Sequence, residues 1–560
     1  MKIKRLYILP VVTLLALSCY EDKGNYDYND DVNSLIVTID RVYGSRKVAS
    51  TFVIEPEVEQ THYKGTDNLR HSWWISHQEL SKGEEVGTTP RLEIEIDPAD
   101  PDFKYNYYIQ YYITDTITGA TRMFPTQLRI AMPYQGAWMV LHQQEDSPRL
   151  GSVEYVGDQT AIDNDAFYSE TGNRLSGTGY SLGVMNGYNS NNRFGNNSVC
   201  MFYMFTSNPA ESGFYAQDKG FQRLGNTTMM FPEDLPYFDA SKVTACCRPQ
   251  VSGGVIASNG EVFQGSVNAA TMGRTELSPA AALDHTDYHI THATTASQVY
   301  LAFDGLHNRF FSVYTRENTW RGVWTGAPDR RQMGKFEYIA KHPTNVQSIN
   351  PDNIGDDKQM VYLGPGYFTG RAVEIAPWQC FAMYAFAVGR TIPRSYVFEF
   401  SSRAMLTPGG ADEPAPFSNY FVIDTPPGVT GSTPMASSWA FNRILFYAIG
   451  NRIYKLDFAA SGGVSTMIYQ HPNPEAKIVS FKMARSIDDP YNTFNEMLPA
   501  ARTLGAGFNL PDGSGELVVL ILNTAGIAEE GMFGDFPTIQ RYSTSTNGQK
   551  FGEIKDIAYI

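Results

Sequence analysis

Cysteine and charge are both scarce in this sequence. It has five cysteines in 560 residues, and charged residues make up only 18% of it. Four of the cysteines, Cys200, Cys246, Cys247 and Cys380, follow Cys19 at spacings that match no CxxC zinc or redox motif. Adjacent Cys246 and Cys247 would point to opposite faces of a strand. We therefore expect buried thiols with at most one disulfide bridge, whose pairing stays open.

Motifs of the common enzyme classes are also missing. The sequence contains no G-x-S-x-G elbow, P-loop or S-x-x-K. Acidic residues are plentiful, but the sequence alone does not place two of them at the separation that a glycosidase needs. The formal net charge of −15 argues against nucleic acid as a partner, because nucleic acid binds Lys/Arg-rich faces. No motif supports an enzyme, and none indicates an organic cofactor.

Long apolar runs are absent after the first residues. The run Leu6–Leu17 follows a positively charged start and is too short to span a hydrocarbon core of about 30 Å. Residues 1–18 therefore indicate a signal peptide. Ser18 precedes Cys19 as in a bacterial lipoprotein signal, so we expect acyl chains on Cys19 that anchor the protein to a membrane. The alternative is an ordinary secretory signal in which Cys19 is incidental.

The residues that follow the signal carry a resemblance. The run Cys19-Tyr20-Glu21-Asp22-Lys23-Gly24-Asn25-Tyr26-Asp27-Tyr28 resembles the start of the PKD-like family lipoproteins of Bacteroidota. A weaker resemblance continues in the segment 34–133 and in Phe551–Ile557. It implies an outer-membrane lipoprotein, facing the cell exterior and often found near TonB-dependent importers of the SusC/SusD type. The resemblance implies no catalytic residues.

Aromatic residues are abundant, at 13% of the chain, which favours β-structure. Residues 19–33 are polar and without periodicity, so we expect a flexible tether. About six short strands follow in residues 34–133, several alternating in period two, as in an Ig/PKD-like β-sandwich. The segment Asp115–Gly119 predicts a hairpin turn with Gly119 at positive φ. We expect one of Trp73 and Trp74 in the core and the other on the surface.

Residues 134–560 show recurrent units of short strands and turns, which predict a β-propeller of about seven blades. Two hairpins are explicit, with turns at Asn259-Gly260 and Gly450-Asn451. The last strand, Ile554–Tyr559, is expected to pair beside Trp138–Leu141 and close the ring. Six or eight blades are also compatible with the repeats, and two further β-sandwiches are the main alternative. The whole chain is thus expected to be all-β.

The sharpest local cluster is a group of histidines. His285, Asp287, His289 and His292 fall within eight residues. On a helix the three histidines would share a face, and on a strand His285, Asp287 and His289 would. Either arrangement can present imidazole nitrogens to a divalent metal such as Zn²⁺. The favoured interpretation is nevertheless a polar loop whose histidines hydrogen-bond locally.

Two further segments, Asp163–Asp165 and Asp352–Asp357, are rich in oxygen ligands. Both depart from the order of residues in a calcium-binding loop. We expect solvated turns in both places, with a cation site as the alternative.

A long segment rich in Gly, Asn, Ser and Tyr covers Thr160–Ser198. Tyrosine with small polar residues is typical of adaptable recognition surfaces. The candidate contact residues are Tyr168, Tyr180, Tyr188 and Arg193. Together with the resemblance, which implies a neighbouring importer, this segment leads us to expect a binding protein that assists that importer, with glycan, peptide and metal or metal-chelate ligands all open. The alternatives are a propeller-type hydrolase or lyase acting on glycans or peptides, and a structural adaptor without a small-molecule ligand.

Overall fold

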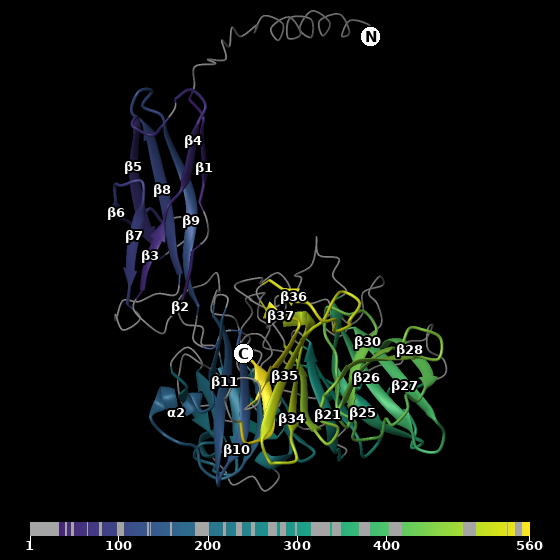
Figure 1. Cartoon of the computed structure of the whole chain (residues 1–560). Coiled ribbons are helices and arrows are strands. Elements are labelled where there is room, and N and C mark those ends of the chain that lie inside the picture. The colour runs from purple at the N-terminus through teal and green to yellow at the C-terminus, as the bar shows by residue number, and fades with distance from the viewer. Residues whose placement is uncertain are drawn as a thin grey trace, which may run out of the picture. The chain divides into compact units, whose positions relative to one another are not determined.

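The structure is a computed structural model, and it divides into two compact units, Met1–Met132 and Pro133–Ile560. Both units are built mainly from strands (Figure 1). The structure describes residues 33–39, 42–45, 50–63, 65–77, 81–97, 106–131, 134, 136–156, 159–184, 201–216, 220–230, 238–247, 253–266, 277–279, 287–296, 299–314, 336–338, 349–368, 381–401, 417–484, 500–534, 536–543 and 551–560. The signal peptide, Cys19 and all but the last residue of the tether lie outside these ranges.

The first unit is built from strands alone within its described residues. Its largest sheet has five strands in the order β2-β9-β8-β5-β6, and β1 pairs with β4 and β3 with β7 in two smaller sheets. The strands are β1 (Leu35–Thr38), β2 (Val42–Ser45), β3 (Ser50–Ile54), β4 (Glu57–Gln60), β5 (Leu69–Ser76), β6 (Glu84–Gly87), β7 (Leu92–Ile96), β8 (Asn106–Asp115) and β9 (Thr121–Ala131). Residues of the five-stranded sheet and of the smaller ones share one hydrophobic core, as expected for a sandwich.

Trp73 lies at the centre of this core. It is fully buried, and its ring stacks on Tyr111 with centroids 3.9 Å apart. Its indole N–H donates to the carbonyl oxygen of Thr89 at 2.7 Å, so burial leaves no polar atom unsatisfied. Trp74, next in the strand, is only half-buried, and the Lys82 ammonium lies 3.8 Å from the centre of its ring. The expected division between the two tryptophans is confirmed.

Seven four-stranded antiparallel sheets make up most of the second unit's described residues, a number compatible with about seven blades. The first three sheets are β12-β11-β10-β39, β13 to β16 and β17 to β20, with strands β10 (Trp138–Gln144), β11 (Ser147–Val156), β12 (Gln159–Asp163), β39 (Glu553–Tyr559), β13 (Gly179–Val184), β14 (Met201–Thr206), β15 (Gly213–Ala216), β16 (Gln222–Asn226), β17 (Val243–Cys247), β18 (Gly253–Ser258), β19 (Glu261–Ser266) and β20 (Leu277–Pro279). The other four are β21 to β24, β25 to β28, β29 to β32 and β33-β34-β35-β38, with strands β21 (Ile290–Ala296), β22 (Val299–Asp304), β23 (Arg309–Tyr314), β24 (Phe336–Tyr338), β25 (Lys358–Phe368), β26 (Phe381–Gly389), β27 (Arg394–Ser401), β28 (Phe417–Asp424), β29 (Met435–Ala436), β30 (Ile444–Ile449), β31 (Arg452–Asp457), β32 (Val464–Gln470), β33 (Lys477–Met483), β34 (Thr503–Asn509), β35 (Gly515–Ile521) and β38 (Ile539–Tyr542).

The remaining elements of the second unit are short. They are the two-stranded pair β36 (Met532–Phe533) and β37 (Phe536–Pro537), the helices α2 (Ala166–Thr171) and α3 (Thr227–Met230), and the 3₁₀ turns η2 (Ala240–Lys242) and η6 (Ala500–Arg502). None of the helices among the described residues is long and apolar enough to cross a membrane.

The last strand of the chain closes the second unit. β39 pairs antiparallel with β10, with Tyr559 opposite Trp138 and Ile557 opposite Val140. The end strands β39, β13, β17, β21, β25, β29 and β33 of the seven sheets contact one another in that cyclic order, and β33 lies back against β39. The fold is therefore a β-propeller, and the expected pairing of the terminal strand with Trp138–Leu141 is confirmed. Two further β-sandwiches, the main alternative for residues 134–560, would not need the terminal strand to pair with the first strand of the unit.

A buried carboxylate reinforces this closure. Asp556 on β39 accepts hydrogen bonds from Ser480 Oγ at 2.6 Å, Lys482 Nζ at 2.7 Å, the Leu182 amide at 2.8 Å and the Ile557 amide at 2.9 Å. The Lys482 ammonium also donates to the carbonyl oxygen of Leu182, at 2.7 Å. These contacts link the end strands of the first, second and last sheets.

Both explicit hairpins form as expected. Asn259 and Gly260 adopt φ values of 51° and 88° between β18 and β19. Gly450 has φ 59° between β30 and β31. In the first unit, Gly119 has φ 75° in the turn that joins β8 to β9. Each turn residue supplies the left-handed backbone that a tight reversal of direction needs.

Candidate ligand-binding cleft

The histidine cluster is only partly described, because His285 lies outside the described residues. β21 begins at Ile290, so the helical arrangement that would include His292 is wrong. Asp287 and His289 are exposed, and the His289 amide donates to Asp304 Oδ1 at 2.9 Å. Burial lowers the pKa of His292 to about 4. Within the described ranges no group of three His, Cys, Asp or Glu side chains is able to hold a metal. A site that includes His285 stays a prediction.

The two oxygen-rich segments form local hydrogen bonds. Asp165 Oδ1 accepts from the Tyr168 amide at 3.4 Å and so caps α2, while Asp163 Oδ1 accepts from the Asp165 amide at 2.9 Å. In the second segment, Asp356 Oδ1 accepts from Asn308 Nδ2 at 2.7 Å, and Asp357 pairs with the Lys358 ammonium at 2.8 Å. The first segment thus caps a helix, and the second forms a turn with local polar contacts.

Thr160–Ser198 is not one long loop where it is described. It contains the end of β12, the helix α2 and the strand β13. Tyr168 projects from α2 and is 46% exposed, whereas Tyr180 on β13 is half-buried. Tyr188 and Arg193 lie outside the described residues. Of the four candidate contact residues, Tyr168 alone is both described and largely accessible.

A cleft of about 670 Å³ lies between α2 and the second sheet, which consists of β13 to β16. This volume falls within the usual range of small-molecule sites, about 300–1,000 Å³. Its walls come from α2 and the residues after it, the β14–β15 connection, β15, and the start of β16. The lining residues are Phe167, Thr171, Asn173, Arg174, Glu211, Tyr215, Gly220, Phe221, Gln222 and Arg223.

The floor of the cleft is aromatic. Phe167, Tyr215 and Phe221 are buried, and the Phe167 ring meets Tyr215 edge-on at 5.7 Å and lies parallel to Phe221 at 6.2 Å. The Tyr215 hydroxyl donates to the backbone carbonyl of Glu211. Burial raises the pKa of Tyr215 well above its ordinary value, so this phenol stays protonated near neutral pH. The floor is thus a fixed apolar base for a polar rim.

The rim carries charged groups of both signs. Arg174 and Arg223 are exposed, and the Arg174 guanidinium lies 5.1 Å from the centre of the Tyr168 ring. Arg223 Nη1 donates to the Ala210 carbonyl. Glu211 accepts from the Ser176 amide at 2.7 Å and from the Ser176 hydroxyl at 3.2 Å. Two guanidinium groups and one carboxylate therefore line the same opening.

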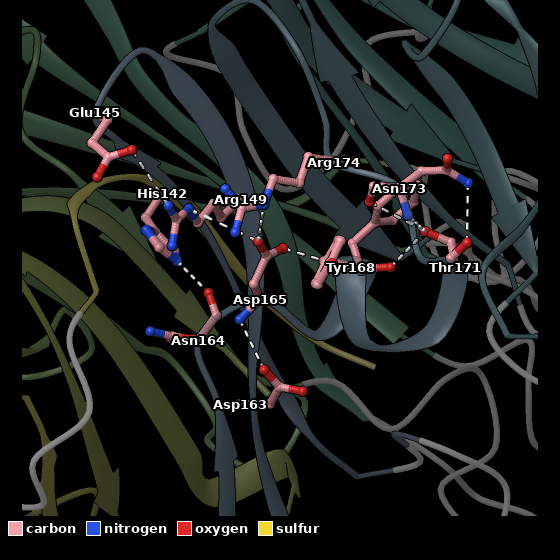
Figure 2. A network of polar contacts seen from close by, with 11 residues as sticks. His142, Glu145, Arg149, Asp163, Asn164, Asp165, Tyr168, Thr171, Asn173 and Arg174 are labelled. Carbon is pink, nitrogen blue, oxygen red and sulfur yellow. Dashed lines mark hydrogen bonds and ion pairs between the residues drawn. The ribbon is translucent and has the colours of Figure 1, made fainter.

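A polar network anchors α2 behind this rim, as Figure 2 shows. Asp165 Oδ2 lies 3.8 Å from Arg149 Nε and 4.0 Å from Arg174 Nε, too far for a hydrogen bond with either. Arg149 Nη2 lies 3.8 Å from Glu145 Oε2. Burial raises the pKa of Asp165, although both arginines oppose this change. The closest contact of the Asp165 side chain is thus the hydrogen bond that caps the helix, and its ion pair with the Arg174 guanidinium is loose.

His142 joins this network to the closing strand. Its Nδ1 accepts from the Gly552 amide at 2.9 Å, so Nε2 carries the proton and donates to the Asn164 carbonyl at 2.8 Å. Burial lowers the pKa of His142 to about 4. The neutral imidazole therefore fixes the turn before α2 against the residue that precedes β39.

The described lining of the cleft supplies groups that can bind a ligand. Guanidinium groups do not give up a proton near neutral pH, and Glu211 is the single carboxylate in the described lining. Glycoside hydrolysis ordinarily needs a pair of carboxyl groups. Sequence reasoning missed Glu211, Gln222 and Arg223, because they follow α2 by some 40 to 55 residues and no spacing signal links them to it.

Comparisons with known proteins return one family model and several distant structural neighbours. No curated protein matches the sequence. A quinoprotein alcohol dehydrogenase-like protein from Bacteroides thetaiotaomicron is 10% identical and superposes with a TM-score of 0.40 over 93% of this chain and 97% of its own. Dihydro-heme d1 dehydrogenase is 10% identical, with a TM-score of 0.35 over 77% of this chain and 76% of its own. The propeller assignment rests on the strand pairings of the chain itself. The model of the PKD-like family matches residues 19–178, which span the first unit and the start of the second.

Proposed function

We propose that this protein is a lipid-anchored binding protein of the outer membrane, facing the cell exterior, that serves a TonB-dependent importer of the SusC/SusD type. Acyl chains on Cys19 hold it in the membrane plane, and the cleft beside α2 binds the ligand. The single observation that carries the binding role is this cleft, with its aromatic floor and its rim of guanidinium, amide and carboxylate groups.

The anchor is supported by the sequence around Cys19. The signal peptide ends at Ser18, and the match to the PKD-like family begins at Cys19 itself. Each buried methylene of an acyl chain contributes about 0.8 kcal/mol to membrane binding, so two or more chains give a stable anchor. Confinement to the membrane raises the effective concentration of the propeller at a neighbouring transporter.

The anchor is tested by Cys19→Ala. The variant should appear in the soluble fraction after cell lysis, whereas the unchanged protein stays with the outer membrane. A Cys200→Ala variant is the matched control, since Cys200 lies outside the signal region and should leave the membrane fraction unchanged. A Cys19→Ala protein that remains in the membrane fraction would refute lipid anchoring at this residue.

The partner is tested by purification of the protein from intact membranes under mild detergent, with mass spectrometry of proteins and small molecules that are retained. We expect a TonB-dependent importer and a bound organic ligand. Retention of the importer without any small molecule would instead favour the structural adaptor. Retention of neither would contradict the proposed role.

A further inference from the structure

We propose that the cleft beside α2 selects an acidic saccharide, whose carboxylate is bound by Arg174 and Arg223. This inference rests on the proposed binding function and names the ligand class of the same site. Arginine suits it because the planar guanidinium matches the geometry of a carboxylate and can donate two parallel hydrogen bonds to it.

Arg174 is oriented, and its ion pair with Asp165 is loose. The face of the Tyr168 ring supports its guanidinium at 5.1 Å, an arrangement that favours one position of a long side chain. Its nearest carboxylate among the described residues, Asp165, lies 4.0 Å away and already caps α2. The donor groups of Arg174 thus remain available to an incoming anion.

Arg223 adds a second cation to the same opening. Its Nη1 donates to the Ala210 carbonyl, which fixes the guanidinium at the edge of the cleft. Among the described residues no carboxylate lies within ion-pair distance of it. The chain carries a net charge of −15. Two guanidinium groups in one opening, of which Arg174 is only loosely paired with Asp165, are therefore a local departure from its overall charge.

The rest of the rim suits hydroxyl groups better than a second anion. Gln222 is exposed and supplies an amide that both donates and accepts. The Glu211 carboxylate accepts from Ser176 through both oxygens. Its remaining lone pairs can accept from ligand hydroxyls, and its charge would repel a further carboxylate. A ligand with one carboxylate per unit and several hydroxyls fits this distribution, and a small dicarboxylate does not.

The test is isothermal titration calorimetry on the full-length lipoprotein in detergent micelles. The three probes are trigalacturonate, its neutral counterpart galactotriose, and succinate. Arg174→Gln and Arg223→Gln each remove one cation from the rim. Arg452→Gln is the matched control, because Arg452 is an exposed arginine on β31 in another sheet. Circular dichroism and the midpoint of urea unfolding establish that each variant is folded.

We expect trigalacturonate to bind at least about tenfold more tightly than either other probe, and its Kd to rise at least about tenfold in each rim variant. Added salt should weaken the binding, and Arg452→Gln should leave it unchanged. Equal binding of galactotriose would overturn the anionic part of the inference. Equal binding of succinate would overturn the saccharide part. No binding of trigalacturonate would overturn the whole inference, while retention of another ligand from membranes would still uphold the proposed function.

Discussion

Replacing Asp556 by alanine should open the propeller at its closing strand. The carboxylate accepts four hydrogen bonds, from Ser480, Lys482, Leu182 and Ile557, at 2.6 to 2.9 Å. These donors belong to the first, second and last sheets. The substitution therefore leaves two backbone amides, one hydroxyl and one ammonium without their shared acceptor.

The expected loss of unfolding free energy depends on how exposed the Asp556–Lys482 ion pair is. Removing one partner of a fully buried pair costs about 3–5 kcal/mol, mostly because the other charge is left unpaired. The Asp556 side chain is 13% exposed, but that of Lys482 is 35% exposed and can regain water. We therefore expect the lower end, about 3 kcal/mol. Glu553→Ala on the same strand is the matched control: its pair with Lys555 is a surface one, and its loss should cost no more than about 1 kcal/mol.

Amide hydrogen exchange measured by mass spectrometry gives the local readout. A loss of about 3 kcal/mol should speed exchange in β10 and β39 by about 100-fold, with little change in β26 on another sheet. The midpoint of urea unfolding of the second unit should fall as well. If Asp556→Ala and Glu553→Ala behave alike in both measurements, the carboxylate does not hold the closure and the reasoning is wrong.

Three further perturbations test other parts of the fold. Burial lowers the pKa of His142 to about 4, so as pH falls below 6.5 the unfolded chain takes up a proton at this residue before the folded protein does. Protonation of the unfolded chain should therefore lower the free energy of unfolding by about 3 kcal/mol between pH 6.5 and 4. A His142→Gln variant should show a shallower dependence of unfolding free energy on pH, and an unchanged slope would contradict the assignment. Gly505→Ala would place a methyl carbon against the buried Trp138 indole and should cost about 1–3 kcal/mol in urea unfolding. Gly531→Ala should cost little, because its added carbon would meet nothing closer than Thr538 Oγ1 at 4.0 Å. Trp73→Ala should destabilise the first unit by about 3–5 kcal/mol and Trp74→Ala by far less, a difference that thermal unfolding would measure and that equal effects would disprove.

Local backbone chemistry is what the sequence predicted best. The pair Asn259-Gly260 and the residues Gly450 and Gly119 adopt positive φ where reversals were expected, because few other residues tolerate that backbone. The closing strand was also predictable, since a propeller needs its ends joined and Ile554–Tyr559 is an isolated strand at the end of the chain.

The helix α2 was missed although its signals were present. Asp165 stands at the N-cap, and Gly172 adopts φ 70° directly after the last helical residue, Thr171. The acidic side chains around Asp165 were interpreted as a solvated turn, with a cation site as the alternative, because a capping carboxylate, a turn residue and a metal ligand are the same residue type. A helix of six residues also gives too little periodicity to identify.

The cleft rim and the closure of the propeller depend on the same segment of chain. Gln143, on the strand that pairs with β39, donates through Nε2 to the Gly177 carbonyl at 3.0 Å and accepts from the Gly179 amide at 3.3 Å. A few residues on, Leu182 bonds to Asp556 through its amide. The chain that runs from Arg174 into β13 is thus held at several points by the first sheet, which is complete only when the terminal strand is in place. Binding at the rim should therefore favour the closed ring, and a variant that loosens closure, such as Asp556→Ala, should also weaken any ligand that Arg174 contacts, even though the substitution lies outside the cleft.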